Sequence, residues 1–596
     1  MEPNALPRSV HNVHRATAAW LLIVGVVVAV DPAGLWPFGP LRWLVVSTCG
    51  LAVVAVCWWR PERTLDRPTR RLWLVLLTFL ALGAAANGDV WIAFVGTDTR
   101  HFGMFTWLLC FGVFCAGQQL RGHDTVLVKA CAVAALATGL WCAWELAFGP
   151  PIALAATTDR LSGPFGSAAL LGAAICLLLP PTLALAVDRS QQLAWRAGAK
   201  IAALLCTVAV IGSGARAAFV GLIVAAAIVA FRVPLTRRPL AAAAAVVLVG
   251  IAIALPRVEN VLERSAGTTS RVDEWRIAAK VVADHPLVGV GPEGYRIAFS
   301  EGVDADYERT YPRDRVLPDR AHSSLLDVSL AGGVIAGLTF AALMFLVARR
   351  AIQLMPATSA AGIGLSAAVL AYFSAQLLLF PVFELDPIAW LLAGAVVGMR
   401  PTHGPSPRST PAGVSRAARP LAACAAAVGL VALTAGLFDV AANRLARDAL
   451  TASAHGDNAA AAHLASRATG LRPDAISYRM TAVQVLLAAD TVGATDSALK
   501  DAGRARDWSH HDPIAADLWA SSLLQRALQT GAAADTHAAL DAWTALVERD
   551  PQRGRWQLQL GTAAAAAGET ELAREAWQRA VALGQAQAAQ LLDALP

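Results

Sequence analysis

Long apolar stretches alternate with short polar segments over the first three quarters of the chain. Thirteen of these stretches predict helices that cross about 30 Å of membrane hydrocarbon. They lie at about 17–35, 41–59, 72–87, 104–119, 125–148, 167–187, 201–213, 216–231, 239–255, 324–348, 357–380, 388–399 and 421–439. The pattern therefore predicts an all-α fold, a polytopic transmembrane helical bundle of about 12–13 spans.

The polar remainder divides the chain into domains. Residues 1–400 form the predicted multi-spanning membrane domain, and within it the polar stretch 256–322 is a single large loop. Residues 401–439 are a basic linker followed by the last transmembrane helix. Residues 440–596 are rich in alanine and predict a soluble domain of helical repeats.

Small residues recur at helical spacing in this last domain, and Pro473, Pro513 and Pro551 interrupt the pattern. In the final unit, Gly561 and Trp577 occupy the small and large packing positions of a tetratricopeptide helix pair. Three or four such repeats are predicted. Stacked helix pairs leave a concave face for a partner, but a rigid cap without any ligand explains the same pattern.

Composition excludes a purely soluble enzyme. Hydrophobic residues make up 56% of the 596 positions and charged residues only 15%, whereas a soluble domain carries roughly 25% charged residues. The nine cysteines lie inside apolar runs and not at CxxC spacings, so neither disulfides nor a zinc site is predicted. The net charge of +6 is spread between the apolar runs and gives no nucleic-acid-binding face.

The positive charges predict the orientation of the spans. With the N-terminus inside, the inner segments hold twenty Lys and Arg residues, against four arginines in the short outer segments. Because Lys and Arg are retained on the cytoplasmic side, loop 256–322 and the C-terminus are predicted to be extracytoplasmic. We therefore expect a multi-pass protein of the bacterial cytoplasmic membrane.

Outward-facing polar residues are the candidates for chemistry. No P-loop, HExxH or GxSxG motif is present. Arginine presents a planar fork that suits phosphate oxygens, so several outer arginines together would form an anion site. The candidate residues are Arg100, Arg160, Arg216, Arg271, Trp275 and His322.

Each candidate also has a simpler interpretation. Arg100, Arg160 and especially Arg42 could be anchors that snorkel to the head groups. Arg216 opens a span directly after a glycine break, where helix ends expose backbone N–H groups to an anion. His322 could be solvated at the interface.

Three acidic residues also lie near the predicted spans. Glu145 lies inside an apolar run, which makes it a functional candidate. The alternatives are that it is neutral, or that it pairs with Lys129 or with another helix. Glu384 and Asp386 are expected to be hydrogen-bonding loop residues.

Four motifs in sequence order resemble one family. These are "RLSGPFG", "GSGARAAF", "SRVDEWRIAAKVVADHPLVGVGPEGYRIAF" and "AHSSLLDVSLAGGVIAG". Their order and spacing are similar to those of the O-antigen ligase and polymerase superfamily, over roughly residues 90–400. The resemblance implies a membrane glycosyltransferase that moves a glycan from a polyprenyl diphosphate carrier to an acceptor hydroxyl, without a cofactor or a required metal.

The resemblance also implies roles for the candidates. Arg216 and Arg271 would hold the diphosphate and stabilise it as it leaves, and His322 would orient or deprotonate the acceptor. Arg100, Arg160 and Trp275 would contact the diphosphate or the glycan.

Three functions stay open. The first is ligation of a finished glycan to a lipid, wall polymer or protein, and the second is polymerisation of repeat units. The third is a membrane transporter, against which stand the single large loop and the lack of paired broken helices in two matching halves.

Overall fold

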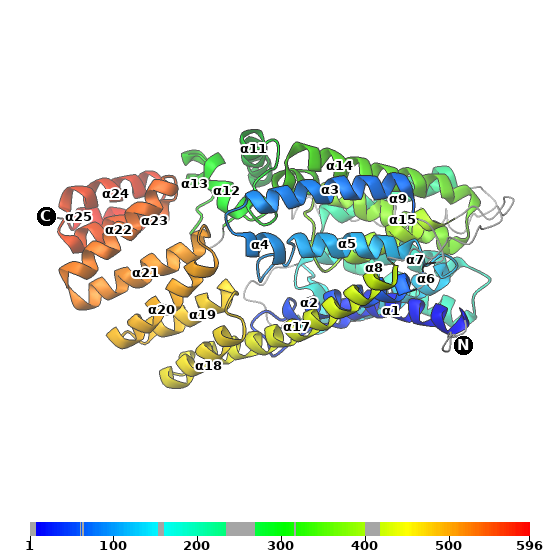
Figure 1. Ribbon diagram of the computed structural model, residues 1–596, viewed down its shortest axis with the longest axis horizontal. Coiled ribbons are helices and arrows are strands. Elements are labelled where there is room, and N and C mark those ends of the chain that lie inside the picture. Colours follow the sequence, from blue (N-terminus) through cyan, green and yellow to red (C-terminus); the bar gives the residue numbers. More distant parts are fainter. Residues whose placement is uncertain are drawn as a thin grey trace.

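The computed structural model describes residues 8–59, 61, 65–152, 160–233, 269–314, 317–399 and 418–595. Within these ranges the chain is helical and contains no strand, as the hydrophobic pattern predicts. Figure 1 shows an elongated molecule, with a bundle that carries the N-terminus and a helical array that ends at the C-terminus.

Twelve of the thirteen predicted spans fall on helices of the bundle, and the span at 239–255 lies outside the described residues. The helices are α1 (Arg8–Val28), α2 (Pro40–Trp59), α3 (Arg67–Ala86), α5 (Met104–Gly117), α6 (Asp124–Phe148), α7 (Ala168–Val187), α8 (Leu193–Ser213), α9 (Arg216–Arg232), α14 (Ser324–Leu354), α15 (Ala360–Gln376), α16 (Asp386–Gly398) and α17 (Ala418–Ala454).

Seven described helices are long and apolar enough to cross a membrane: α2, α3, α6, α7, α8, α14 with its extension to Ala357, and α17. Four apolar helices are shorter, namely Val13–Val28, α5, α15 and α16. Because a helix rises 1.5 Å per residue, the 14 residues of α5 span only about 21 Å. The structure supports a multi-pass membrane protein, and the count of thirteen crossings stays a prediction.

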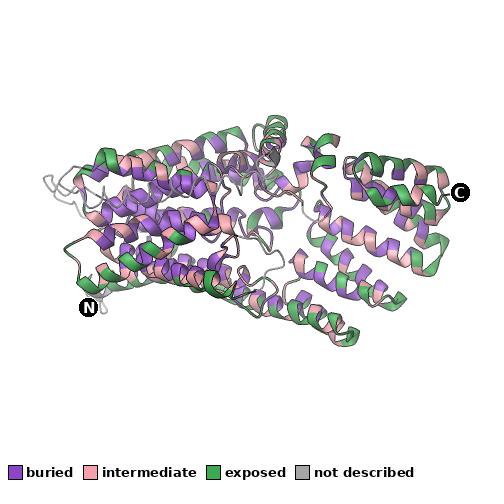
Figure 2. Cartoon of the chain, turned by 180° about the vertical axis from the view of Figure 1, so that it is seen from behind, coloured by how far each residue is buried: buried purple, intermediate pink, exposed green. Residues whose placement is uncertain are grey.

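The bundle is packed around α7, α15 and α16, whose residues are mostly buried. Figure 2 shows buried positions along the inside of the bundle. By contrast, α17 packs along α2 and leaves large apolar side chains outside, such as Leu430 and Val431, which are 65% and 69% exposed. An apolar face without a protein neighbour on such a helix suits lipid.

A glycine break in α14 joins the bundle to the polar loop. Gly332 and Gly333 leave helical geometry, and Gly333 has φ +78°. The loop after α11 (Thr269–Asp284) fills the gap, since Val334 N–H donates to the Pro286 carbonyl (2.9 Å) and Val290 N–H to the Leu330 carbonyl (2.7 Å). The "HPLVGVG" turn is therefore locked onto α14, which fixes α11 beside it.

The described residues of the predicted large loop, 269–314 and 317–322, contain three helices joined by turns. They are α11, α12 (Tyr295–Gly302) and α13 (Ala305–Thr310). These helices lie at the end of the bundle that faces the C-terminal array (Figure 1), and α4 (Val90–Val95) lies at the same end.

The C-terminal array consists of consecutive helices, each packed on the next. They are α18 (Asn458–Leu471), α19 (Ile476–Ala488), α20 (Val492–Trp508), α21 (Pro513–Thr530), α22 (Ala533–Arg549), α23 (Gly554–Ala567), α24 (Thr570–Ala582) and α25 (Ala586–Asp593).

The predicted packing positions of the last repeat are in contact. A Cβ on Gly561 would lie 2.4 Å from the Trp577 ring, so only glycine allows α23 and α24 this close. Pro513 is the first residue of α21, and Pro551 lies between α22 and α23. The tetratricopeptide assignment itself stays a prediction.

One helix crosses the predicted domain boundary at 439/440, because α17 continues to Ala454 and packs on α18. The array is also tied to the polar loops. Buried Arg313 binds Glu308 of α13 (2.6 Å) and Asp550 at the end of α22 (2.7 Å). The array therefore covers the end of the bundle that holds the predicted site residues.

Candidate functional site

Three of the predicted arginines gather at this end of the bundle. Arg160 precedes the short turn η1 (Gly163–Phe165), Arg216 is the first residue of α9, and Arg271 lies in the first turns of α11. Burial lowers the pKa of Arg160, and the charges of Arg216 and Arg271 lower it further. Three segments that are distant in sequence therefore bring positive charges close enough to repel one another.

Local hydrogen bonds fix the Arg160 loop against the start of α9. The Nε of Arg160 donates to the carbonyl of Ser213 (2.7 Å), one turn before Arg216. Leu161 N–H donates to the Gly212 carbonyl (3.1 Å). The backbone between α8 and α9 thus holds Arg160 in place through these two hydrogen bonds.

Glu145 holds the same loop from the other side. Its carboxylate accepts hydrogen bonds from the backbone N–H groups of Ser162 (2.9 Å) and Gly163 (2.8 Å), and from the Ser162 hydroxyl (3.0 Å). This accounts for a carboxylate in an apolar helix. The alternative partner considered for it, Lys129, instead lies over the Trp195 ring, 4.8 Å from its centroid.

Arg42 is not the exposed membrane anchor that its position suggests. Its side chain is fully buried, and it donates to the carbonyls of Val26 (2.9 Å) and Pro164 (2.5 Å). Its guanidinium also stacks on Phe165. Arg42 therefore supports the turn that follows Arg160. A sequence cannot distinguish this buried role from snorkelling, because both place an arginine at the end of a span.

Arg100 and His322 meet on a shared aromatic ring. The Arg100 guanidinium lies 5.2 Å from the centroid of Phe380, and the His322 ring lies 5.1 Å from it. Arg100 also makes a two-point ion pair with Asp319 (2.6 and 3.0 Å). Burial alone would raise the pKa of Asp319, but Arg100 and Arg320 outweigh it and hold that pKa below its usual value.

His322 has an unusual backbone. Its φ is +53°, in the left-handed region that non-glycine residues rarely adopt. Asp327 of α14 holds this turn by accepting a hydrogen bond from Ala321 N–H (2.9 Å). Such local strain is characteristic of functional positions.

The imidazole of His322 is neutral at physiological pH. Burial and then the charge of Arg271 lower its pKa to about 4, although Asp319 acts in the opposite direction. A neutral imidazole is able to accept a proton. The charge of Arg271 lowers the pKa of both His322 and Arg160. The histidine and the arginine cluster therefore share one electrostatic environment.

Sequence reasoning missed Glu274, which lies between Arg271 and His322. Its Oε2 is 4.0 Å from Nε2 of His322. The signal was its spacing, since residues three apart on a helix share a face and Glu274 follows Arg271 by three. The neighbouring Trp275 is half-buried, and its Nε1 has no acceptor among the described residues. Among the described residues, we find no ring or cation–π contact between Trp275 and the arginines.

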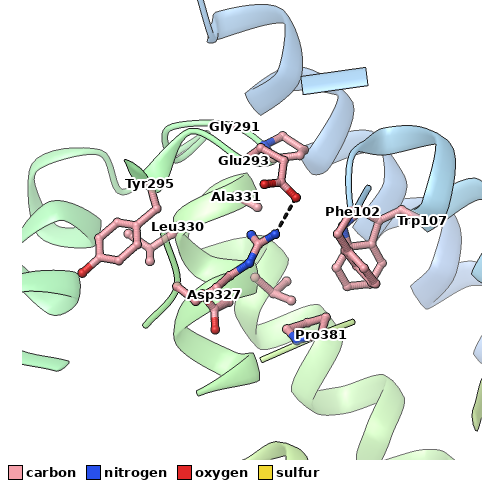
Figure 3. Close-up of a pocket in the computed structure, with 12 residues that line it drawn as sticks. Phe102, Trp107, Gly291, Glu293, Tyr295, Asp327, Leu330, Ala331 and Pro381 are labelled. Atoms are coloured by element: carbon pink, nitrogen blue, oxygen red, sulfur yellow. Dashed lines mark hydrogen bonds and ion pairs between the residues drawn. The ribbon is translucent and has the colours of Figure 1, made fainter. Parts of the chain in front are cut away.

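A small cavity lies between α5, α12 and α14 (Figure 3). Asp327, Phe102, Trp107 and Tyr295 line it, and Arg320 crosses it to bind Glu293 at 2.5 Å. None of the six predicted site residues lines this cavity. Within the described residues, no three His, Cys, Asp or Glu side chains gather as metal ligands.

Comparison with known families addresses the same region. Residues 201–341 match the family model of O-antigen ligase. This O-antigen ligase match contains Arg216, Arg271, Glu274 and His322, and it ends within α14. It supports placing the chain in the O-antigen ligase superfamily and a glycan ligase or polymerase role in polysaccharide assembly. No curated protein matches the chain.

Proposed function

We propose that this protein transfers a glycan from a polyprenyl diphosphate to an acceptor hydroxyl at the outer face of the cytoplasmic membrane. The observation that supports this most is the arginine cluster of Arg160, Arg216 and Arg271 beside a neutral His322. Gathering three like charges costs free energy, and a dianionic diphosphate would offset that cost.

The cluster suits the departing diphosphate. As the bond between the sugar C1 and the diphosphate oxygen breaks, its electron pair goes to the leaving oxygen. Guanidinium groups already in place stabilise this developing charge without reorganisation. Trp275 on α11 and Arg100, whose charge acts on His322, are candidates for contacting the glycan or the diphosphate.

His322 suits the acceptor side of the reaction. The acceptor hydroxyl would give its proton to the neutral imidazole as its oxygen forms the new bond to C1. Phe380 and the Asp327-held turn fix the ring. The reaction balances, with one glycosidic bond formed, one phosphate ester bond broken and one proton transferred to the protein.

Two features favour ligation over polymerisation. The C-terminal array sits over the polar loops through Arg313 and Asp550, where it would meet a large acceptor or a protein partner. The charge bias of twenty inner against four outer residues supports an extracytoplasmic array. Polymerisation of repeat units remains the second candidate, because the match to residues 201–341 supports it equally.

Cells with and without the gene distinguish the two. A ligase predicts that the lipid-linked glycan of the deletion strain keeps its chain length while the attached glycan is lost. A polymerase predicts that the lipid-linked chains shorten to single repeat units. If neither fraction changes, the transferase proposal is wrong.

A further inference from the structure

Glu274 has a half-buried carboxyl group with one oxygen that accepts no hydrogen bond. This oxygen, Oε2, is inaccessible to solvent and finds no donor among the described residues. Buried acceptors are normally satisfied, and one left open at a candidate site calls for an explanation. Nε2 of His322 lies 4.0 Å from it.

The His322 ring presents one edge to this carboxyl group. Its other nitrogen, Nδ1, is buried and has no partner within the described part of the chain. A separation of 4.0 Å is too long for a hydrogen bond, but it is short enough for the two groups to attract each other when both are charged. Nε2 is therefore the ring nitrogen that lies beside Glu274.

The charged groups around Glu274 come from several elements. Burial raises the pKa of Glu274 to about 7, Asp273 adds to this, and Arg271 opposes it. The hydroxyl of Tyr295 on α12 lies 3.5 Å from the Glu274 carbonyl. Burial and then the charge of Glu274 raise the pKa of Tyr307 on α13.

The surroundings of His322 make its imidazole a poor final site for a proton. Besides Glu274, it faces Arg271 on α11, Arg100, and Asp319 and Arg320 of its own loop. Three of these groups are cationic, so an imidazolium formed here needs a compensating anion. Glu274 is a carboxyl group close to His322, whereas the carboxylate of Asp319 is already bound to Arg100.

We propose that Glu274 is a positioning residue for the transfer, and that its carboxylate pairs with the imidazolium formed when His322 takes the proton of the acceptor hydroxyl. This inference rests on the proposed glycan transfer and extends it. The O–H bond of the acceptor breaks, the proton passes to Nε2, and the resulting charge is balanced by Glu274. The negative charge of the leaving diphosphate is balanced separately, by the arginines.

The pH dependence of transfer follows from this pairing. The carboxylate must be ionised, so activity falls as the pH drops below about 7, the pKa of Glu274. The imidazole stays neutral down to about pH 4, so His322 alone would give no loss between pH 5 and 7. The diphosphate diester of the donor does not titrate in this range. This loss of activity toward acid pH is the acid limb of the pH profile. If Glu274 had a structural role only, replacing it would change stability, and the wild-type profile would have no such limb.

The test measures kcat/KM for the donor, which reports ionisations of the free enzyme. The full-length protein in nanodiscs receives lipid-linked glycan extracted from the deletion strain, with acceptor membranes of the same strain. The variant is Glu274→Gln. The control is Glu301→Gln, which breaks the other Glu–His pair of this region, at His285 (2.8 Å).

We expect Glu274→Gln to lower kcat about tenfold or more, to leave KM for the donor unchanged and to remove the acid limb between pH 5 and 7. Glu301→Gln should keep the wild-type rate and limb. Should Glu274→Gln fail to fold, Glu274→Asp must retain the limb at a reduced rate, and a full rate would overturn the inference.

Two failures are distinguishable. An active wild type with an equally active Glu274→Gln variant, and the same pH profile for both, overturns the role of Glu274 alone. A folded wild type that transfers no glycan at any pH overturns the proposed function as well.

Discussion

Arginine is the residue on which the proposed site depends, because it stays charged even where burial and like charges oppose it. The pKa of Arg160 is lowered by burial and by its two arginine neighbours, yet the guanidinium starts from so high a pKa that the group remains a cation. A lysine in the same surroundings would lose its proton far more readily. Charge and fork geometry together therefore favour arginine here.

Replacing Arg216 with lysine tests this choice. We expect Arg216→Lys to lower the transfer rate at least tenfold, because an ammonium group cannot make two parallel hydrogen bonds to a diphosphate. Losing one charge-assisted contact of about 1.5–3 kcal/mol corresponds to such a factor if the contact acts in the transition state. Rates are compared at equal protein level, with Arg232→Lys at the opposite end of α9 as control. Equal rates for both variants would leave Arg216 as a membrane anchor.

Residue types and spacing predict part of this site. The outer arginines stand out because the short outer segments hold only four of them against twenty inner Lys and Arg, and His322 stands out because imidazole titrates near neutral pH. The structure brings Arg160, Arg216, Arg271 and His322 into one electrostatic neighbourhood. Glu274 could not be singled out, since a carboxyl group on a polar helix is ordinary until its burial is known. Partners distant in sequence, such as Asp319 for Arg100, are equally invisible.

At the scale of elements, the helices α6 and α2 together hold the turn that follows Arg160. Glu145 near the end of α6 accepts two backbone hydrogen bonds from the turn after Arg160, and Arg42 of α2 binds the carbonyl of Pro164. The turn is thereby held between two helices. Its placement follows from charged groups that satisfy backbone atoms away from water.

Neutralising Glu145 should loosen this turn. Glu145→Gln removes the charge that strengthens three hydrogen bonds to the turn, so we expect KM for the lipid-linked donor to rise about three- to tenfold with little change in kcat. An unchanged KM would show that the turn keeps Arg160 in place without the carboxylate. Lys129→Gln, on the same helix but over Trp195, serves as the control and should behave as wild type.

Helices were predictable at this scale, and their interruptions were not. Apolar length predicts the spans, because a helix in hydrocarbon must be long and apolar. The break at Gly332 and Gly333 depends instead on a turn nearly fifty residues earlier, in which the carbonyl of Pro286 accepts a hydrogen bond from Val334 N–H. Such tertiary hydrogen bonds leave no local pattern.

At the scale of the whole molecule, orientation is the main prediction. The excess of inner Lys and Arg predicts an extracytoplasmic C-terminus. Alkaline phosphatase fused after Pro596 should therefore be active and a GFP fusion dark. A bright GFP fusion with inactive phosphatase would show that the number of crossings differs by one.

The docking of the array on the loops was not predictable from sequence. It depends on buried pairs such as Arg313 with Asp550, which are 237 residues apart. Helical periodicity identifies the array, but only the folded chain shows which face it covers. That placement is what connects the array to the proposed acceptor side.

The most direct test of the proposed transfer is the release of polyprenyl diphosphate by purified protein. Full-length protein in nanodiscs is added to membranes of the deletion strain, which supply donor and acceptor, and released carrier and attached glycan are both measured. We predict equal amounts of the two with wild type, and a rate lower by about 10²–10⁴-fold with His322→Ala. Wild-type protein that releases no carrier, or a His322→Ala variant that keeps more than about a tenth of the rate, would contradict the account.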